Sequence, residues 1–159
     1  MKKIGLILMM ITVIISCQHG RPTLSESERD DIESAILALN DIAVKAAQHA
    51  DLETMFDTIG ENDRGVIIRD GNLIKTKAEA FELYQQLFQN VAKVEYIFNQ
   101  QYVHVLSKEI AYLTASGESV MTTRDQREFR TPFAQTIVYV KQGDAWKVLH
   151  THASTPNRK

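Results

Sequence analysis

Two histidines near the C-terminus are the residues with the clearest chemical potential. His150 and His152 stand two positions apart in the run Trp-Lys-Val-Leu-His-Thr-His, which begins at Trp146. Side chains two apart on a strand project from the same face. Strict alternation therefore predicts that both imidazoles share a face with Trp146 and Val148. An imidazole near neutral pH can act as a general acid or base, a metal ligand or a hydrogen-bonding group.

Several roles remain open for these two histidines. A catalytic zinc site would need a third protein ligand, and the spacing favours none of His104, Glu95 and Glu118 for it. The sequence therefore predicts neither a metal nor another cofactor. The roles left are a general acid or base, a contact to a ligand that is not turned over, and hydrogen bonds that only support the structure.

The histidines lie in the last of four strand-like segments. Glu128 to Gln142 is rich in β-branched and aromatic residues, and the Gly143-Asp144 turn leads from it into Ala145 to Ser154. Val94 to Leu106 and Ile110 to Thr122 have the same character and are separated by short polar breaks. Four consecutive strands with short connections predict an antiparallel meander.

Alternation alone does not decide which face of the sheet bears one carboxylate in the middle of a strand, but the residues on the other side of that strand favour one answer. Ala111 and Leu113 lie on the small, apolar face of their strand, which suits packing beneath helices, and Glu118 falls on the other face. We therefore expect Glu118 to point outward. Parity does not decide the faces of Arg130 and Gln135, and His104 between two valines reads as structural.

Three helices are expected before the strands. The capping box Ser25–Glu28 begins a long amphipathic helix, Asp51 caps a short one that ends with Gly60 at the C′ position, and Thr76–Glu79 begins a third. Tyr84 lies on the apolar side of the third helix. The expected inward positions are Ile32, Ala35, Ile36, Leu39, Ile42, Ala43 and Ala46 in the first helix, Leu52, Met55, Phe56 and Ile59 in the second, and Ala80, Phe81, Tyr84, Leu87, Phe88 and Val91 in the third.

A small hairpin separates the second and third helices. Val66 to Arg69 reads as one strand, Asp70-Gly71 as its turn, and Asn72 to Ile74 as the returning strand. Helices and a hairpin followed by a run of strands predict an α+β fold with the helices on one face of the sheet.

Composition argues against nucleic-acid binding and against an intramolecular disulfide. A chain of 159 residues provides one domain and a leader, and its formal charge of −2 comes without any basic run. Nucleic-acid binding is therefore not expected. Cys17 is the sole cysteine, so no intramolecular disulfide can form.

The first residues predict a lipoprotein signal peptide. Lys2 and Lys3 precede the apolar run Ile4 to Ile15, which is too short to span a membrane as a helix and ends at Ser16-Cys17. This ending resembles a bacterial lipobox, which implies cleavage after residue 16, lipidation of Cys17 and a mature formal charge of −4. Residues 17–24 would form the tether of a domain spanning 25–156. Gln18 after the cysteine implies anchoring in the cell envelope, at the outer membrane facing the periplasm if the source is Gram-negative.

Three local patterns resemble the SnoaL-like group of the nuclear-transport-factor-2-like superfamily. They are Asp51 to Phe56 after a long helix, the Asp70-Gly71 turn leading to Thr76 to Phe81, and the Trp-x-x-x-His-x-His-x-Ser ending at Ser154. The resemblance covers nearly all of 25–156. It implies a curved antiparallel sheet wrapped on three N-terminal helices into a cone, as in a cystatin-like roll, with a pocket on the concave face and frequent homodimerisation.

The resemblance leaves three functions open. The first is binding of a small, partly apolar molecule in the cone, with Trp146, His150, His152 and Tyr84 as contacts. The second is an isomerase, dehydratase or cyclase that uses a pocket histidine as general acid or base, although strand residues 129–140 carry no carboxylate to match the family's catalytic Asp. The third is a dimeric module for protein interaction. In all three the membrane is contacted only through the lipid anchor.

Overall fold

The computed structural model describes residues 24–61 and 64–156. The expected signal peptide, Cys17 and most of the tether lie outside the described residues. Within the described part of the chain, no helix is both long and apolar enough to cross a membrane.

Helix α1 (Glu26–Gln48) begins at the expected capping box. The hydroxyl of Ser25 accepts from the backbone N–H of Glu28, and the Glu28 carboxylate accepts from the backbone N–H of Ser25. Ile36 is fully buried, but Ile42, expected on the same face, is 47% exposed. The polar residue Asn40 is buried on this helix instead of Ile42. Its burial is tolerated because its side-chain oxygen accepts a hydrogen bond from the Tyr139 hydroxyl.

Helix α2 (Leu52–Asp57) is shorter than expected. Asp51 caps it by accepting from the backbone N–H of Thr54, as predicted. The prediction that Gly60 is the C′ residue is wrong, since the helix already ends at Asp57. The chain then runs beside the last strand, where the N–H of Gly60 donates to the carbonyl of Val148.

The small hairpin and third helix follow in the expected order. Strands β1 (Ile67–Arg69) and β2 (Asn72–Ile74) are joined by Asp70 and Gly71, both at positive φ as a tight primed turn requires. Helix α3 (Lys77–Phe88) is capped by the Thr76 hydroxyl. It ends before Val91, which begins the next strand, and Leu87 is half exposed rather than inward.

The predicted four-strand meander is confirmed. Strands β3 (Val91–Val105), β4 (Ile110–Thr123), β5 (Glu128–Gln142) and β6 (Ala145–Ser154) pair in succession as antiparallel neighbours. The hairpin joins the same sheet, because β1 pairs in parallel with β6, which strand patterns alone did not indicate. The resulting order is β2-β1-β6-β5-β4-β3, and the α+β fold is as expected.

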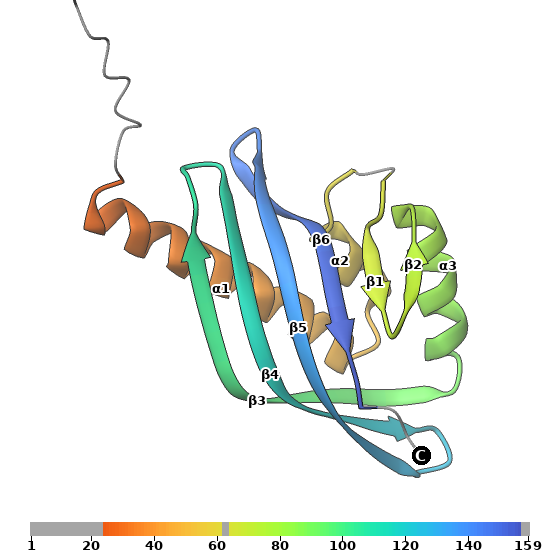
Figure 1. Ribbon diagram of the computed structural model, residues 1–159. Helices are drawn as coiled ribbons and strands as arrows, with labels where there is room; N and C mark the ends of the chain where they lie inside the picture. The colour runs from red at the N-terminus through yellow and green to blue at the C-terminus, as the bar shows by residue number, and fades with distance from the viewer. Residues whose placement is uncertain (1–23, 62–63, 157–159) are drawn as a thin grey trace, which may run out of the picture.

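The helices cover one face of this sheet. In Figure 1, α1 crosses behind the long strands, and α2 and α3 lie at the side of the hairpin. The core lies between α1, α2 and the sheet, and Tyr139 and Leu113 are among its most deeply buried side chains. Its buried members are Ile36, Phe56, Ile59, Val66, Ile67, Ile74, Ala80, Ala111, Leu113, Ala115, Ile137, Tyr139 and Val148.

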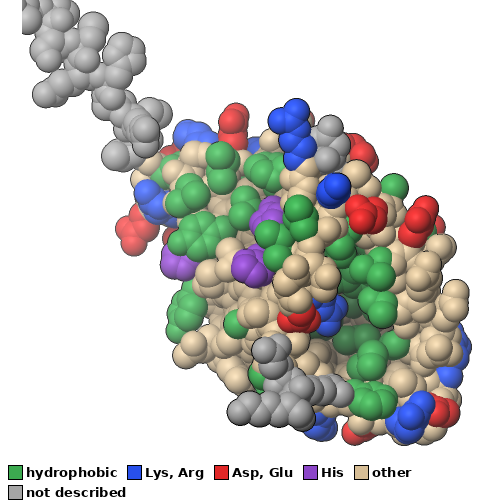
Figure 2. All heavy atoms as spheres, turned by 45° about the vertical axis from the view of Figure 1, so that its right-hand side comes forward, with side chains coloured by type: hydrophobic (Ala, Val, Ile, Leu, Met, Phe, Trp, Pro, Cys, Tyr) green, Lys and Arg blue, Asp and Glu red, His purple; other side chains and the backbone are tan. Residues whose placement is uncertain are grey.

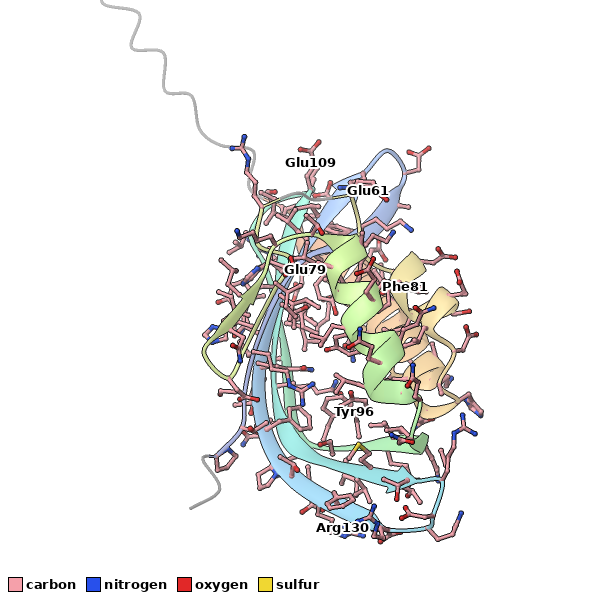
Figure 3. The ribbon with its side chains drawn as sticks, turned by 90° about the vertical axis from the view of Figure 1, so that its right-hand side faces the viewer. Glu61, Glu79, Phe81, Tyr96, Glu109 and Arg130 are labelled. Carbon is pink, nitrogen blue, oxygen red and sulfur yellow. The ribbon has the colours of Figure 1, made fainter. Side chains whose placement is uncertain are left out.

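The long strands bend sharply in their middle (Figures 1 and 3). At the bend, Asn99 is an extra residue on β3, since Phe98 pairs with Gly117 and Gln100 with Ser116. A Cβ atom on Gly117 would lie 2.2 Å from the backbone carbonyl oxygen of Ile97. The bend therefore requires a glycine, because only a residue without a side chain allows the two backbones to approach so closely.

Replacing this glycine tests the bend. We expect Gly117→Ala to destabilise the fold by about 1–3 kcal/mol, because the added methyl must push the β3 backbone away. Ser116→Ala, next to it on the outer face, should change the stability by less than about 0.5 kcal/mol. Urea denaturation followed by circular dichroism measures both variants. Equal stabilities for the two would mean that the bend does not depend on the glycine.

The start of α1 contributes pH-dependent stability. Hydrogen bonds from Lys108 and Ser25 lower the pKa of Glu28 from 4.5 to about 2. A carboxylate whose pKa is depressed in the folded state stabilises the fold above its unfolded pKa, and this stabilisation is lost as the pH falls towards 2. The difference in melting temperature between wild type and Glu28→Gln should therefore shrink from pH 5 to pH 2. Glu33→Gln, exposed on the same helix, is the control; an equal pH trend for both would contradict this role of Glu28.

Candidate functional site

An irregularity in β6 separates the residues that alternation had placed together. Val138 of β5 pairs with His150, but the next residue, Tyr139, pairs with Val148. Leu149 is thus an extra residue on β6, and side chains on its two sides lose their alternation. Val148 faces the core opposite Tyr139, whereas His150 lies opposite Val138 on the other face.

The prediction that the histidines share a face with Trp146 and Val148 is therefore wrong. Trp146 packs against the core cluster on the inner face. His150 and His152 do share a face with each other, but it is the outer face of the sheet. Histidine side chains are visible at the surface in Figure 2.

His150 lies beside the hairpin. Its Nδ1 is 2.7 Å from the carbonyl oxygen of Gly65. Because a carbonyl oxygen only accepts, the ring carries a proton on Nδ1, and in the neutral form Nε2 is left as an acceptor. The open pocket around this ring is lined by Arg64, Gly65, Ile68, Leu73, Lys75 and His150.

His152 contributes to a different surface feature. An open groove of about 450 Å³ crosses the outer face of β3 to β6. Its lining combines hydroxyl and amide groups with apolar side chains, and more of the lining surface is apolar than polar. Its side chains include Gln100, Tyr102, Thr114, Ser116, Thr136 and His152.

The inner face changes character along the strands. Over α1, inward-facing residues such as Leu113 and Tyr139 are almost completely buried. Beyond the bend, the inward-facing Tyr96, Phe98 and Phe133 remain partly exposed. These side chains lie on a part of the concave face that is only partly covered, and Figure 3 shows Tyr96 between α3 and the curved sheet. The concave face is therefore tightly packed over α1 and less completely covered beyond the bend.

Aromatic rings line this less covered part of the concave face, which we call the cone hollow. On the sheet, the Phe133 ring centroid lies 5.8 Å from those of both Tyr96 and Phe98, in edge-to-face contact. On the helices, the Tyr84 ring lies 5.7 Å from that of Phe56. The lining is thus mostly aromatic, with one phenol contributed by α3 (Tyr84) and one by β3 (Tyr96).

Arg69 provides a positive charge beside these two hydroxyls. It lies on the inner face of β1, two residues after the core residue Ile67, and its guanidinium hydrogen bonds with the Tyr84 side chain. Burial opposes its charge, but the neighbouring Tyr84, Tyr96 and Asp70 outweigh burial and raise the pKa of Arg69. Its side chain is 48% exposed, which places it at the mouth of the hollow.

Tyr96 keeps its proton over the physiological range. Burial, with a smaller contribution from Tyr84, raises its pKa to about 12, although Arg69 acts in the opposite direction. Tyr96 is therefore a neutral hydroxyl that can donate a hydrogen bond inside the hollow.

The carboxylate on β4 lies outside, as expected. Glu118 accepts from Arg130 at 2.8 Å, with both side chains partly exposed. Figure 3 shows Arg130 on the convex side of the sheet, away from the hollow. Within residues 24–61 and 64–156, no three His, Cys, Asp or Glu side chains gather as a metal site would require.

Of the residues singled out from the sequence, only Tyr84 lies at the cone hollow. Sequence patterns missed Arg69 and Tyr96 as site residues. Alternation from the apolar Ile67 would have placed Arg69 inward. For Tyr96 no sequence signal distinguishes a hollow from a packed core, because an aromatic residue suits both.

Comparisons with known proteins agree with this architecture. The chain resembles a nuclear transport factor 2-like superfamily protein from Salmonella enterica, with a TM-score of 0.72 and 15% identity over 82% of this chain and 95% of that one. A ketosteroid isomerase-like protein from Erwinia carotovora gives a TM-score of 0.65 and 19% identity over 79% and 96% of the two chains. A type 2 hexachlorocyclohexane dehydrochlorinase gives a TM-score of 0.70 and 11% identity over 84% of this chain and 90% of that one.

At these identities the similar structures show the fold alone. A search of curated proteins found no match. The family model described as SnoaL-like domain matches residues 36–158. This match spans most of the chain, and it includes the second and third helices, the hairpin and all four long strands. The chain therefore belongs to the SnoaL-like domain family.

Proposed function

We propose that this protein binds a small, partly apolar molecule in the cone hollow. The observation that carries the proposal is that Tyr96, Phe98 and Phe133 face inward on the concave face yet remain partly exposed. Small-molecule sites are concave and mostly apolar, with a few polar groups that orient the ligand. Aromatic walls with the polar groups of Arg69 and Tyr84 at the mouth have this composition.

The chemistry of the lining favours binding over turnover. Among the described residues, the inward-facing positions of β1 and β3 to β6 hold no carboxylate and no imidazole. A proton-transfer enzyme needs such a group within hydrogen-bond reach of its substrate. The histidines first considered for this role lie on the outer face, so the isomerase or dehydratase alternative has no general base in the sheet's part of the hollow.

We further propose that the domain is anchored in the cell envelope through a lipid on Cys17. The basic start, the short apolar run and the Ser16-Cys17 ending support this part of the proposal. Anchoring at the outer membrane would place the cone hollow in the periplasm.

A pair of matched variants tests the position of the binding site. Ser119 faces the hollow between Tyr96 and Thr131, and Ser116 on the same strand faces the outer groove. We expect Ser119→Phe to fill the hollow and abolish the ligand hits found for wild type, and Ser116→Phe to retain them. A thermal-shift screen with small apolar acids, alcohols and ketones measures this. Hits lost only in Ser116→Phe would move the site to the outer groove and contradict the proposal.

A second candidate is a homodimer formed through the outer face of the sheet. Ile97 is 50% exposed and Tyr102 is 56% exposed there, although both are large hydrophobic residues. Self-association would remove this apolar area from water. The proposal of a small-molecule site does not depend on it.

The oligomeric state tests this second candidate. We expect sedimentation velocity to show a wild-type dimer and Tyr102→Glu to shift it to monomer, because a charge would be buried at the interface. Ile42→Glu, at an exposed apolar position on helix α1 away from the outer face of the sheet, is the control and should leave the dimer intact. A monomeric wild type would rule out the dimer.

A further inference from the structure

We infer that the ligand of the cone hollow carries a carboxylate, which Arg69 binds together with the hydroxyls of Tyr84 and Tyr96. This inference rests on the proposed function and names the chemical class of its ligand. It follows from four features: convergence of the three groups, an incompletely neutralised cation, two neutral donors and apolar walls.

The three polar groups converge from separate elements. Arg69 comes from β1, Tyr84 from α3 and Tyr96 from β3, and no two are neighbours in sequence. Arg69 hydrogen bonds with Tyr84 and lies close enough to Tyr96 to influence its ionisation. Tertiary structure has thus gathered one cation and two phenols on the inner side of a sheet whose other inward residues are mostly apolar.

The charge of Arg69 is only partly compensated within the protein. The Asp70 carboxylate approaches its Nε at 3.6 Å, which is longer than a hydrogen bond. The other oxygen of Asp70 accepts from the backbone N–H and the hydroxyl of Thr155, which holds that carboxylate towards the C-terminal end of the domain. A guanidinium has five N–H donors in a planar fork that fits a carboxylate, so Arg69 has capacity for an added anion.

The two phenols suit an anionic partner better than a cationic one. Tyr84 accepts a hydrogen bond from Arg69, which leaves its own O–H proton to donate onward. Tyr96 is protonated at neutral pH, as a phenol ordinarily is, and burial raises its pKa further, so it also presents a donor. A carboxylate only accepts, and its two oxygens can take several such bonds.

The remaining walls determine the rest of the ligand. Phe98, Phe133 and the ring faces of the two tyrosines provide aromatic surface beyond the polar groups. A highly polar molecule would lose hydration there without replacement. The fitting class is a small aromatic or aliphatic acid with one carboxylate near the mouth and an apolar body inside.

Two probes that differ only in charge test this assignment. Naphthalene-2-carboxylate and naphthalene-2-carboxamide share the same apolar body, and isothermal titration calorimetry measures both. Wild type should bind the acid about 10-fold to 100-fold more tightly, the range expected when hydrogen bonds to charged groups contribute. Arg69→Gln should bring the two affinities close together while keeping the affinity for the amide, which also verifies that the variant folds.

A control variant and the remaining possible results distinguish failure of the carboxylate assignment from failure of the proposed binding site. Arg130→Gln removes an arginine from the outer face and should keep the preference for the acid. Equal affinities in wild type, or a preference that survives in Arg69→Gln, would overturn the carboxylate assignment and leave binding in the hollow intact. Failure of both probes to bind wild type would count against the hollow as a binding site for aromatic acids and amides alike.

Discussion

The close approach of two backbones at the bend of the sheet is the constraint on which the hollow depends. Gly117 of β4 lies against the carbonyl of Ile97, and the extra residue Asn99 lets β3 turn at the same level. Before the bend, the strands cover α1 and form an ordinary packed core. After it, they curve away from the helices, and the inward side chains Tyr96, Phe98 and Phe133 pack on one another but are only partly buried. One backbone contact thus divides a single sheet into a structural part and a part available to a ligand.

The extra residue in β6 has a comparable effect on the faces of the sheet. Val148 must face inward to pack against Tyr139, and Thr151 must lie opposite Ile137. Because Val148 and Thr151 are three positions apart, both can face inward only if alternation is interrupted once, and Leu149 provides that interruption. The outcome is that His150 and His152 are directed to the outer face. The two histidines therefore face outward because Val148 and Thr151 of the same strand pack inward against the core.

The positive charge of Arg69 lies beside aromatic rings, where losing its hydration would be unfavourable unless polar partners or water replace it. Arg69 stays near the mouth of the cone hollow, where half of its side chain contacts water, so its charge is not fully desolvated. Tyr84 and Asp70 provide further polar partners. In the proposed function, this cation and the neutral donors Tyr84 and Tyr96 would hold the anionic end of a ligand near the entrance, with its apolar body against the aromatic rings. Among the described residues, the inward-facing strand positions hold no carboxylate and no imidazole.

Local sequence features determined most of the fold of this protein. The capping boxes at Ser25 and Thr76, the Asp70-Gly71 turn and the apolar runs of the strands each act over a few residues, so helix starts, the hairpin and the meander follow from them. The site depended on tertiary structure. The pairing of Tyr139 with Val148 is a contact between strands, and it alone decides that Trp146 and His150 lie on opposite faces. The meeting of Arg69, Tyr84 and Tyr96 likewise requires β1, α3 and β3 to be placed in space, because residues far apart in the chain carry no periodicity that relates one to another.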